Sequence, residues 1–324
     1  MYQTYIFENG LRLIHYRVPA KAAYCGLIIN VGSRDEREEE AGIAHFIEHV
    51  IFKGTEKRKA YHILSRLEDV GGELNAYTTK EDTCVYATFM AKDYERALEL
   101  FADLVFHSVF PEKEIEKEKD VVLDEINSYK DTPGELIFDD FEELVYEGYH
   151  IGRNILGDEA AVEKISRDMI LNFVRRNYSP DRMVISSVGD IPFEKLVRLV
   201  EKYFAGYGRR GEPLARVKPE LYVPRFVELD KETHQSHCII GNVAYDSKED
   251  KRLPLSLLVN LLGGTGMNTR LNLNIRERYG LAYNIEASYT PYSDTGVFMI
   301  YFGCDRENVN WCLELCKREM KALC

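Results

Sequence analysis

Two histidines and a glutamate stand close together in the segment His45-Phe46-Ile47-Glu48-His49. His45 and His49 are four residues apart, so on a helix they share one face, about one turn from each other. Two imidazoles placed in this way can bind one metal ion, and zinc is the ion that best suits a nitrogen pair combined with a carboxylate. Glu48 lies next to that face, where it could act as general base on a water at the metal. The spacing therefore predicts a zinc centre.

The same segment could also be an ordinary helix that happens to carry polar side chains. The other residues within and around the segment are apolar, however: Ala44, Phe46, Ile47, Val50, Ile51 and Phe52. Polar groups buried among such residues without partners are costly, and a metal ion would remove that cost. We therefore favour the metal site over a helix without one.

A zinc site built on two histidines needs a third protein ligand and leaves the fourth position for water. A predicted helix that opens at Pro111 and reaches Tyr129 offers two candidates, because Glu118 and Glu125 fall within its apolar stripe. They are seven residues apart and lie on the same face. Helices normally keep carboxylates off the core side unless something compensates for burial. Periodicity alone does not choose between Glu118 and Glu125 as the ligand.

The helices with the candidate ligands must be held in place by other elements. Alternating apolar and polar residues, or continuous apolar runs, predict strands, and segments with helical periodicity lie between these strands. In the first part of the chain we expect strands at 4–7, 11–16, 24–31, 73–79, 83–90 and 183–188. The run 24–31 is apolar enough to be buried on both faces. Helices are expected at about 41–52, 60–70, 94–108, 111–129 and 193–204.

A stretch rich in glycine and proline, from Gly206 to Pro224, is typical of a linker. After it we expect strands at 225–229 and 237–243, helices at 253–262 and near 270–279, two further strands and a final helix. The part 279–320 resembles the part 71–105, because both predict strand, turn, strand and amphipathic helix. We interpret this as a degenerate internal duplication whose second copy has no HxxEH segment.

These elements predict an α+β fold with two related domains, each a mainly antiparallel sheet packed against helices. Residues 1–210 are expected to form the zinc-binding catalytic domain. Residues 225–324 are expected to form the second, homologous domain. It ends at Cys324 without counterparts for the helices after Pro111, so we expect it to be truncated at its C-terminal end.

The composition limits the partners of the protein. Of the 324 residues, 45% are hydrophobic and 30% are charged, as in ordinary soluble proteins. A net charge of -12 argues against nucleic acid as a partner, since nucleic-acid binding needs clustered Lys and Arg. No run approaches the roughly 20 apolar residues that cross a bilayer, and no signal peptide is recognised, so no membrane partner is expected. The seven cysteines lack paired spacing, which favours a reduced, cytoplasmic protein.

Around the segment from His45 to His49, the sequence resembles the inverzincin zinc peptidases, the family of pitrilysin, insulin-degrading enzyme and mitochondrial processing peptidase. The resemblance extends over Gly32, the segment from Gly42 to His49, and Phe52-Lys53-Gly54-Thr55. It implies zinc as the cofactor and a peptide as the substrate. It also implies that Glu125, 76 residues after His49, is the third ligand and that Glu118 supports the site as an orienting acid.

The resemblance implies substrate contacts as well. The segment around Asn75 and Ala76 is similar to the edge strand of the family, beside which extended substrate adds as a further strand. Without the resemblance, Asn75 would be a residue that ends or kinks a strand. Arg276 and Tyr283 resemble a pair that contacts the substrate or its carbonyl in the transition state. From the sequence alone they would be a charge on a helix surface and an aromatic residue on a strand.

In the family, the zinc site and the Arg/Tyr pair belong to opposing halves of a clamshell that encloses unfolded peptides. This chain is too short for both halves yet carries both motifs. The resemblance therefore implies a zinc endopeptidase that acts as a homodimer, in which Arg276 and Tyr283 of one subunit complete the site of the other. The alternative is a non-catalytic structural or substrate-presenting subunit of a processing-peptidase-like heterodimer.

Overall fold

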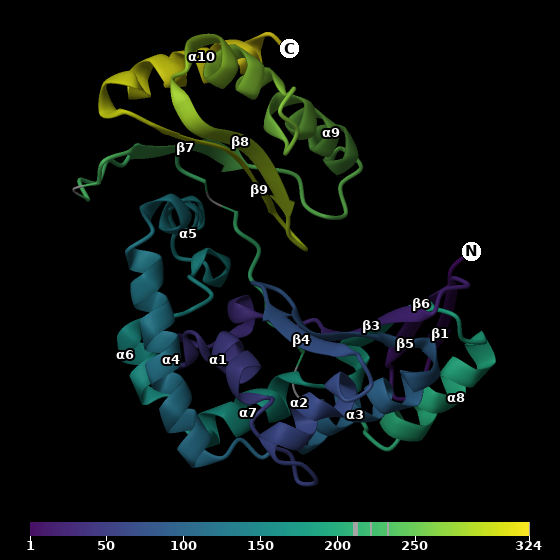
Figure 1. Ribbon diagram of the computed structural model, residues 1–324. Coiled ribbons are helices and arrows are strands. Elements are labelled where there is room, and N and C mark those ends of the chain that lie inside the picture. The colour runs from purple at the N-terminus through teal and green to yellow at the C-terminus, as the bar shows by residue number, and fades with distance from the viewer. Residues whose placement is uncertain (210–212, 221, 232, 324) are drawn as a thin grey trace. The chain divides into compact units, whose positions relative to one another are not determined.

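The computed structural model of the protein describes residues 1–209, 213–220, 222–231 and 233–323. Gly211 of the expected linker and Cys324 lie outside these residues. The contacts divide the chain into two compact units (Figure 1). The first consists of Met1–Ile126 and Asn154–Arg216, and the second of Asn127–Arg153 and Val217–Cys324. Each unit is described by itself below.

The first unit is built on one sheet of six strands. They are β1 (Gln3–Ile6), β2 (Arg12–Arg17), β3 (Ala22–Ile29), β4 (Glu73–Thr78), β5 (Thr83–Met90) and β6 (Met183–Gly189). Their order across the sheet is β1-β2-β6-β3-β5-β4, with β2 and β6 parallel and the other neighbours antiparallel. Strand β4 therefore forms one edge, as expected for the segment with Asn75.

Helices cover one face of this sheet, which determines how its strands are buried. Helices α3 (Tyr94–His107) and α8 (Phe193–Phe204) pack against the strands (Figure 1). On β3, Leu27 and Ile29 are fully buried, whereas Tyr24 is 55% exposed. The expectation that β3 is buried on both faces is wrong, because no helix covers the face of Tyr24 within the described part of this unit.

The remaining helices of the first unit carry and support the candidate site. They are α1 (Ile43–Val50), α2 (Ala60–Glu68), α6 (Glu159–Lys164), α7 (Arg167–Asn177) and the first part of α4 (Glu112–Lys130). Gly71 follows α2 with a positive φ of 75°, the conformation in which glycine commonly ends a helix. Helix α1 contacts both β4 and α7, so it lies between the sheet edge and the later helices.

The second unit is a three-stranded antiparallel sheet in the order β7-β9-β8, with helices on both faces. Its elements are β7 (Ser236–Val243), β8 (Ala282–Pro291), β9 (Gly296–Cys304), α5 (Pro133–Val145), α9 (Arg252–Gly263) and α10 (Val309–Lys321). Ile300 and Phe302 of β9 pack with α9 and α10 in one core cluster. Met299, one position away, packs with the end of α5 in another cluster. This alternation is that of a strand buried on both faces.

Residues 127–153 group with the second unit rather than the first, because α5 packs against β7. The strand expected at 225–229 is wrong: this segment has no strand partner among the described residues, and Phe226 is 84% exposed. Whether the two units are domains bounded by residues 1–210 and 225–324 stays a prediction.

The two units repeat one arrangement of elements. In the first, β3, α1, α2, β4, β5 and α3 follow one another; in the second, β7, α9, the helix around Asn272–Glu277, β8, β9 and α10 do so. The sheet order β3-β5-β4 matches β7-β9-β8, and all these pairs are antiparallel. The α+β fold with two related parts is confirmed. Among the described residues, no helix is long and apolar enough to cross a membrane.

Candidate metal centre

The start of helix α1 is determined by Gly42 and Glu36. Gly42, its N-cap residue, has a φ of 83°, and a Cβ there would come within 2.5 Å of the carbonyl oxygen of Leu156. Buried Glu36 accepts hydrogen bonds of 2.9 Å from the backbone N–H groups of Gly42 and Ala44. A carboxylate at a helix N-terminus pairs with otherwise unbonded N–H groups and the positive end of the helix dipole. These contacts fix the start of the helix that carries the two histidines.

The structure brings His45, His49 and Glu125 together. One ligand atom from each residue can be chosen so that all three lie within 4.8 Å of one another. Nε2 of His49 lies 3.5 Å from Oε2 of Glu125, and Nε2 of His45 lies 3.8 Å from the same oxygen. The two imidazole ring centroids are 4.7 Å apart. Helix α4 thus directs Glu125 at the histidine face of α1.

This donor set fits zinc. Ligands about 2.1 Å from a tetrahedral zinc ion lie roughly 3.4 Å from each other, close to the separations between Glu125 and the histidines. Two imidazoles and one carboxylate are a donor set found in catalytic zinc sites, where the fourth position stays open. The burial of the three residues decreases from His45, which is buried, to the partly exposed His49 and Glu125. One side of the site is therefore accessible to solvent.

Glu118 contacts His49 from the other side of its ring. Its Oε2 lies 3.3 Å from Nδ1 of His49, and its Oε1 lies 2.5 Å from Nζ of Lys53. The two carboxylates that periodicity could not tell apart thus meet different nitrogens of His49. Glu125 faces Nε2, and Glu118 faces Nδ1. The roles of ligand and of supporting acid remain predictions.

Burial shifts the protonation of two residues on α1. It lowers the pKa of His45 to about 4, and His49 contributes in the same direction, so His45 is neutral near pH 7. A neutral imidazole is the form that binds a metal. Burial also raises the pKa of Glu48, more than the nearby His49 lowers it. A carboxylate with a raised pKa is a better proton acceptor than a solvated one.

The edge strand places Asn75 and Ala76 at the border of the sheet. Within the described part of the chain, β4 pairs with β5 on one side only, and α1 contacts β4. Oδ1 of Asn75 accepts a hydrogen bond of 2.8 Å from the N–H of Ala76. Asn75 does not end the strand, which continues to Thr78. The expected role of the pair in binding substrate stays a prediction.

Arg276 and Tyr283 belong to the second unit. Arg276 is exposed in a π-helical turn, Asn272–Glu277. Tyr283 is 63% exposed and lies where the register of β8 and β9 shifts between Ala282 and Asn284. Such bulges and π turns redirect side chains and are frequent at functional sites. Neither irregularity is visible in the sequence, and the role of this pair stays a prediction.

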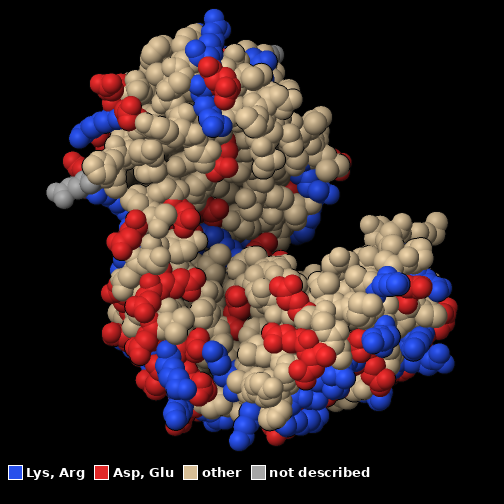
Figure 2. All heavy atoms as spheres, viewed as in Figure 1, with Lys and Arg blue, Asp and Glu red and all other residues tan. Residues whose placement is uncertain are grey.

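Acidic side chains gather over α4 in Figure 2. The exposed acids of this helix are Glu112, Glu116, Asp120 and Asp124, and they form its solvated face. Glu118 is buried and Glu125 is partly buried. The helix therefore separates its acids into a solvent-facing group and a pair directed at α1.

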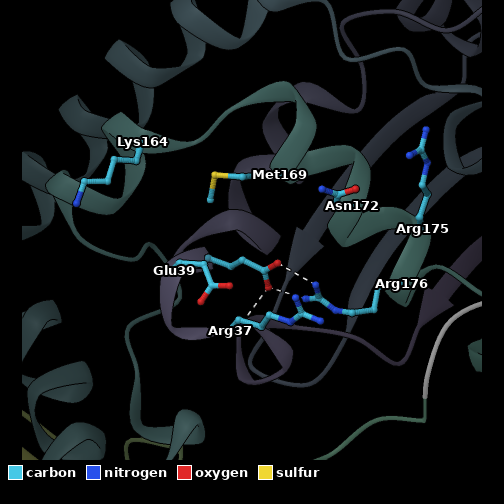
Figure 3. A pocket seen from close by; sticks show the side chains of 8 residues that line it. Arg37, Glu39, Lys164, Met169, Asn172, Arg175 and Arg176 are labelled. Atoms are coloured by element: carbon cyan, nitrogen blue, oxygen red, sulfur yellow. Dashed lines mark hydrogen bonds and ion pairs between the residues drawn. The ribbon is translucent and has the colours of Figure 1, made fainter.

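A depression of about 600 Å³ lies in the first unit, lined by residues other than those of the metal centre. Arg37, Lys164, Arg175 and Arg176 are among its lining residues. Arg176 forms a bidentate ion pair with Glu40, in which its two Nη atoms lie 2.9 and 2.5 Å from the carboxylate oxygens. Lys164 and Arg175 point away from that pair (Figure 3). The cations do not converge on one point, so we assign this depression no ligand.

Comparisons with known proteins cover nearly the whole chain. Residues 13–159 match the family model described as insulinase (peptidase family M16), and residues 164–324 match the model described as peptidase M16 inactive domain. The chain is 36% identical to the uncharacterized zinc protease YmxG of Bacillus subtilis, over 94% of this chain and 74% of that protein. It is 33% identical to an uncharacterized zinc protease of Streptomyces coelicolor, over 96% of this chain and 70% of that protein.

Solved structures show the same fold. A peptidase M16 inactive domain from Pseudomonas fluorescens superposes with a TM-score of 0.93 at 21% identity, over 99% of this chain and 79% of that one. A protease from Helicobacter pylori superposes with a TM-score of 0.87 at 23% identity, over 94% and 75% of the two chains.

Proposed function

The chain belongs to the insulinase-like M16 peptidase family, and from this premise we propose that it is a zinc-dependent endopeptidase that hydrolyses unfolded oligopeptides. The observation that carries the proposal is the convergence of His45, His49 and Glu125 on one point, with Glu48 on the same helix. The names of the relatives, zinc proteases, support zinc as the metal.

His45, His49 and Glu125 would hold the metal. Zinc supplies Lewis-acid chemistry at such a site: it acidifies water and polarises the carbonyl group under attack. Glu48 takes the proton from the attacking water and then gives it to the nitrogen of the departing amine, so the peptide bond is exchanged for a carboxylate and an amine. Glu118 orients His49 through Nδ1, which leaves Nε2 for the metal.

The substrate would bind in an extended form beside β4. The outer edge of this strand is unpaired among the described residues, and main-chain pairing along it accepts many sequences with little selectivity. Asn75 and Ala76 are the contacts we propose on this strand. Their mutual hydrogen bond would have to be exchanged for one to the peptide. An enclosed chamber would then admit unfolded chains and exclude folded ones.

We further propose that the active enzyme is a homodimer. Each zinc centre would be completed by Arg276 and Tyr283 of the partner subunit, which would contact the substrate carbonyl as its charge develops. Both residues are exposed in the second unit, and each lies at an irregular turn or bulge. Their exposure supports this part of the proposal.

The decisive variant is Glu48→Gln, which keeps the shape of the side chain and removes the proton acceptor. We expect it to lower the rate of cleavage of a quenched-fluorescence peptide library by about 10²–10⁴-fold while bound zinc is retained. Glu68→Gln, a matched change at an exposed position on α2, should leave the rate unchanged. If the wild type binds zinc but shows no chelator-sensitive cleavage, a non-catalytic subunit becomes the better reading.

The dimer has a separate test. The Glu48→Gln protein is mixed with the Arg276→Ala protein under conditions that allow subunits to exchange. Mixed dimers contain one site with an intact zinc centre and an intact partner arginine, so part of the activity should return. Two inactive variants that fail to restore activity in any ratio would show that the sites are not completed across subunits.

A further inference from the structure

Lys53 is joined to the zinc centre through Glu118. Its Nζ lies 2.5 Å from Oε1 of Glu118, whose other oxygen lies 3.3 Å from Nδ1 of His49. We propose that Lys53 is a positioning residue of this centre: it holds the Glu118 carboxylate so that His49 keeps Nε2 directed at the metal. The inference rests on the proposed function, because it concerns the same site.

The burial of the three residues indicates why Glu118 needs a cation. The side chain of Glu118 is 10% exposed, that of His49 22% and that of Lys53 29%. Glu118 stands in the apolar stripe of α4, close to buried Ile115 and Val122. An ionised carboxylate in such surroundings is costly unless it is paired and hydrogen-bonded. Lys53, which follows α1 directly, supplies that charge from the same segment as the histidines.

The two oxygens of Glu118 have separate partners. Because a carboxylate only accepts hydrogen bonds, its contact with His49 requires the proton to be on Nδ1, which leaves Nε2 free as a metal ligand. Lys53 holds the opposite oxygen, so the carboxylate cannot rotate away from the imidazole. Nδ1 of His45, in contrast, is buried and has no hydrogen-bond partner among the described residues. His49 is thus the ligand whose orientation this chain of contacts supports.

Removing the charge of Lys53 should change zinc affinity in opposite directions for two possible roles of this residue, namely positioning Glu118 and acting only through its charge. A lysine near the site repels a divalent cation, so a purely electrostatic role predicts that removing its charge strengthens zinc binding. A positioning role predicts weaker binding, because loss of a group that orients a ligand typically costs about 10–100-fold in metal affinity. The two readings therefore predict opposite changes.

The experiment measures zinc affinity of the purified protein by competition with a chromogenic chelator, together with kcat and KM for peptide cleavage. We expect Lys53→Met to weaken zinc binding by about 10-fold or more. Lys53→Arg should restore affinity to within about 3-fold of the wild type, since it keeps a cation beside the carboxylate. Lys57→Met is the matched control, an exposed lysine in the same loop, and should have no effect.

A double variant keeps the test independent of folding. In a Glu118→Gln background, Lys53→Met should change zinc affinity by less than about 2-fold, since its route to His49 is already removed. Equal or tighter zinc binding by Lys53→Met, or an undiminished effect in the Glu118→Gln background, would overturn the inference. A wild-type protein that does not bind zinc would instead overturn the proposed function.

Discussion

The two units of this protein use one arrangement of strands and helices for different purposes. In the first, α1 follows β3 and carries His45, Glu48 and His49 with a buried apolar side. In the second, α9 follows β7 at the corresponding place and carries leucines instead. Three of these, Leu253, Leu257 and Leu261, are exposed at helical spacing. The same backbone framework therefore does not by itself produce a metal site.

Two additions distinguish the first unit. Glu36 binds the N-terminal N–H groups of α1, whereas α9 has no side chain at its N-cap that accepts such a bond. Helix α4, which lies outside the repeated elements, then brings Glu118 and Glu125 to α1. The comparison teaches that the chemistry depends on residues outside the repeated elements.

The largest effect should come from removing the acid that α4 contributes. Glu125→Ala is expected to weaken zinc binding by more than about 100-fold, because loss of a direct ligand exceeds the cost of losing a supporting residue. Peptide cleavage should disappear with it. Metal content after dialysis and chelator competition measure the change. Asp124→Ala, at the exposed neighbouring position, is the control and should retain zinc. Retention of zinc by Glu125→Ala would contradict the ligand set.

The next effect compares the two corresponding helices directly. Ile47 on α1 is fully buried and Leu257 on α9 is 73% exposed. Ile47→Ala should lower the free energy of unfolding by about 3 kcal/mol, through lost burial and a cavity. Leu257→Ala should change it by less than about 0.5 kcal/mol. Urea unfolding of both variants measures the difference. A similar loss in both would show that the exposed leucines of α9 are covered in solution.

A smaller loss is expected from the contact that positions α1. Glu36→Gln leaves one oxygen to serve two N–H groups and places an amide donor against the other. We expect the free energy of unfolding to fall by about 2 kcal/mol. Glu39→Gln, at an exposed position nearby, should be neutral. Chemical denaturation of the metal-free protein measures the free energy of unfolding of both variants. Equal values would show that the contacts of Glu36 do not stabilise α1.

The smallest effect concerns pH. His15 is fully buried in the first unit, and burial lowers its pKa below 6.5. The folded protein then binds this proton less readily than the unfolded chain, so stability falls as the pH drops below 6.5. Between pH 7.5 and 5.0, part of the loss of stability should therefore come from His15. His15→Gln should lose less stability over that interval, as measured by urea unfolding at both values. An equal loss would exclude His15 as the cause.

Much of the fold followed from periodicity. The strands at β4, β5 and β6 and the helices α3, α8 and α9 lie within one or two residues of their expected positions, since each has an uninterrupted pattern between clear turn signals. The errors have one physical origin. Among the residues that the structure describes, the segment 225–229 has no strand to pair with, and no helix covers one face of β3. Pairing and coverage depend on distant segments, which local pattern does not report.

For the site, the sequence by itself determined the three-residue pattern of α1, because helical spacing alone places His45 and His49 on one face. It also marked Glu118 and Glu125 as acids out of place in an apolar stripe. Only the tertiary structure decided which imidazole nitrogen each carboxylate meets, since that depends on how α4 crosses α1. The contact of Lys53 with Glu118 was decided in the same way, because the two residues are 65 positions apart in the chain.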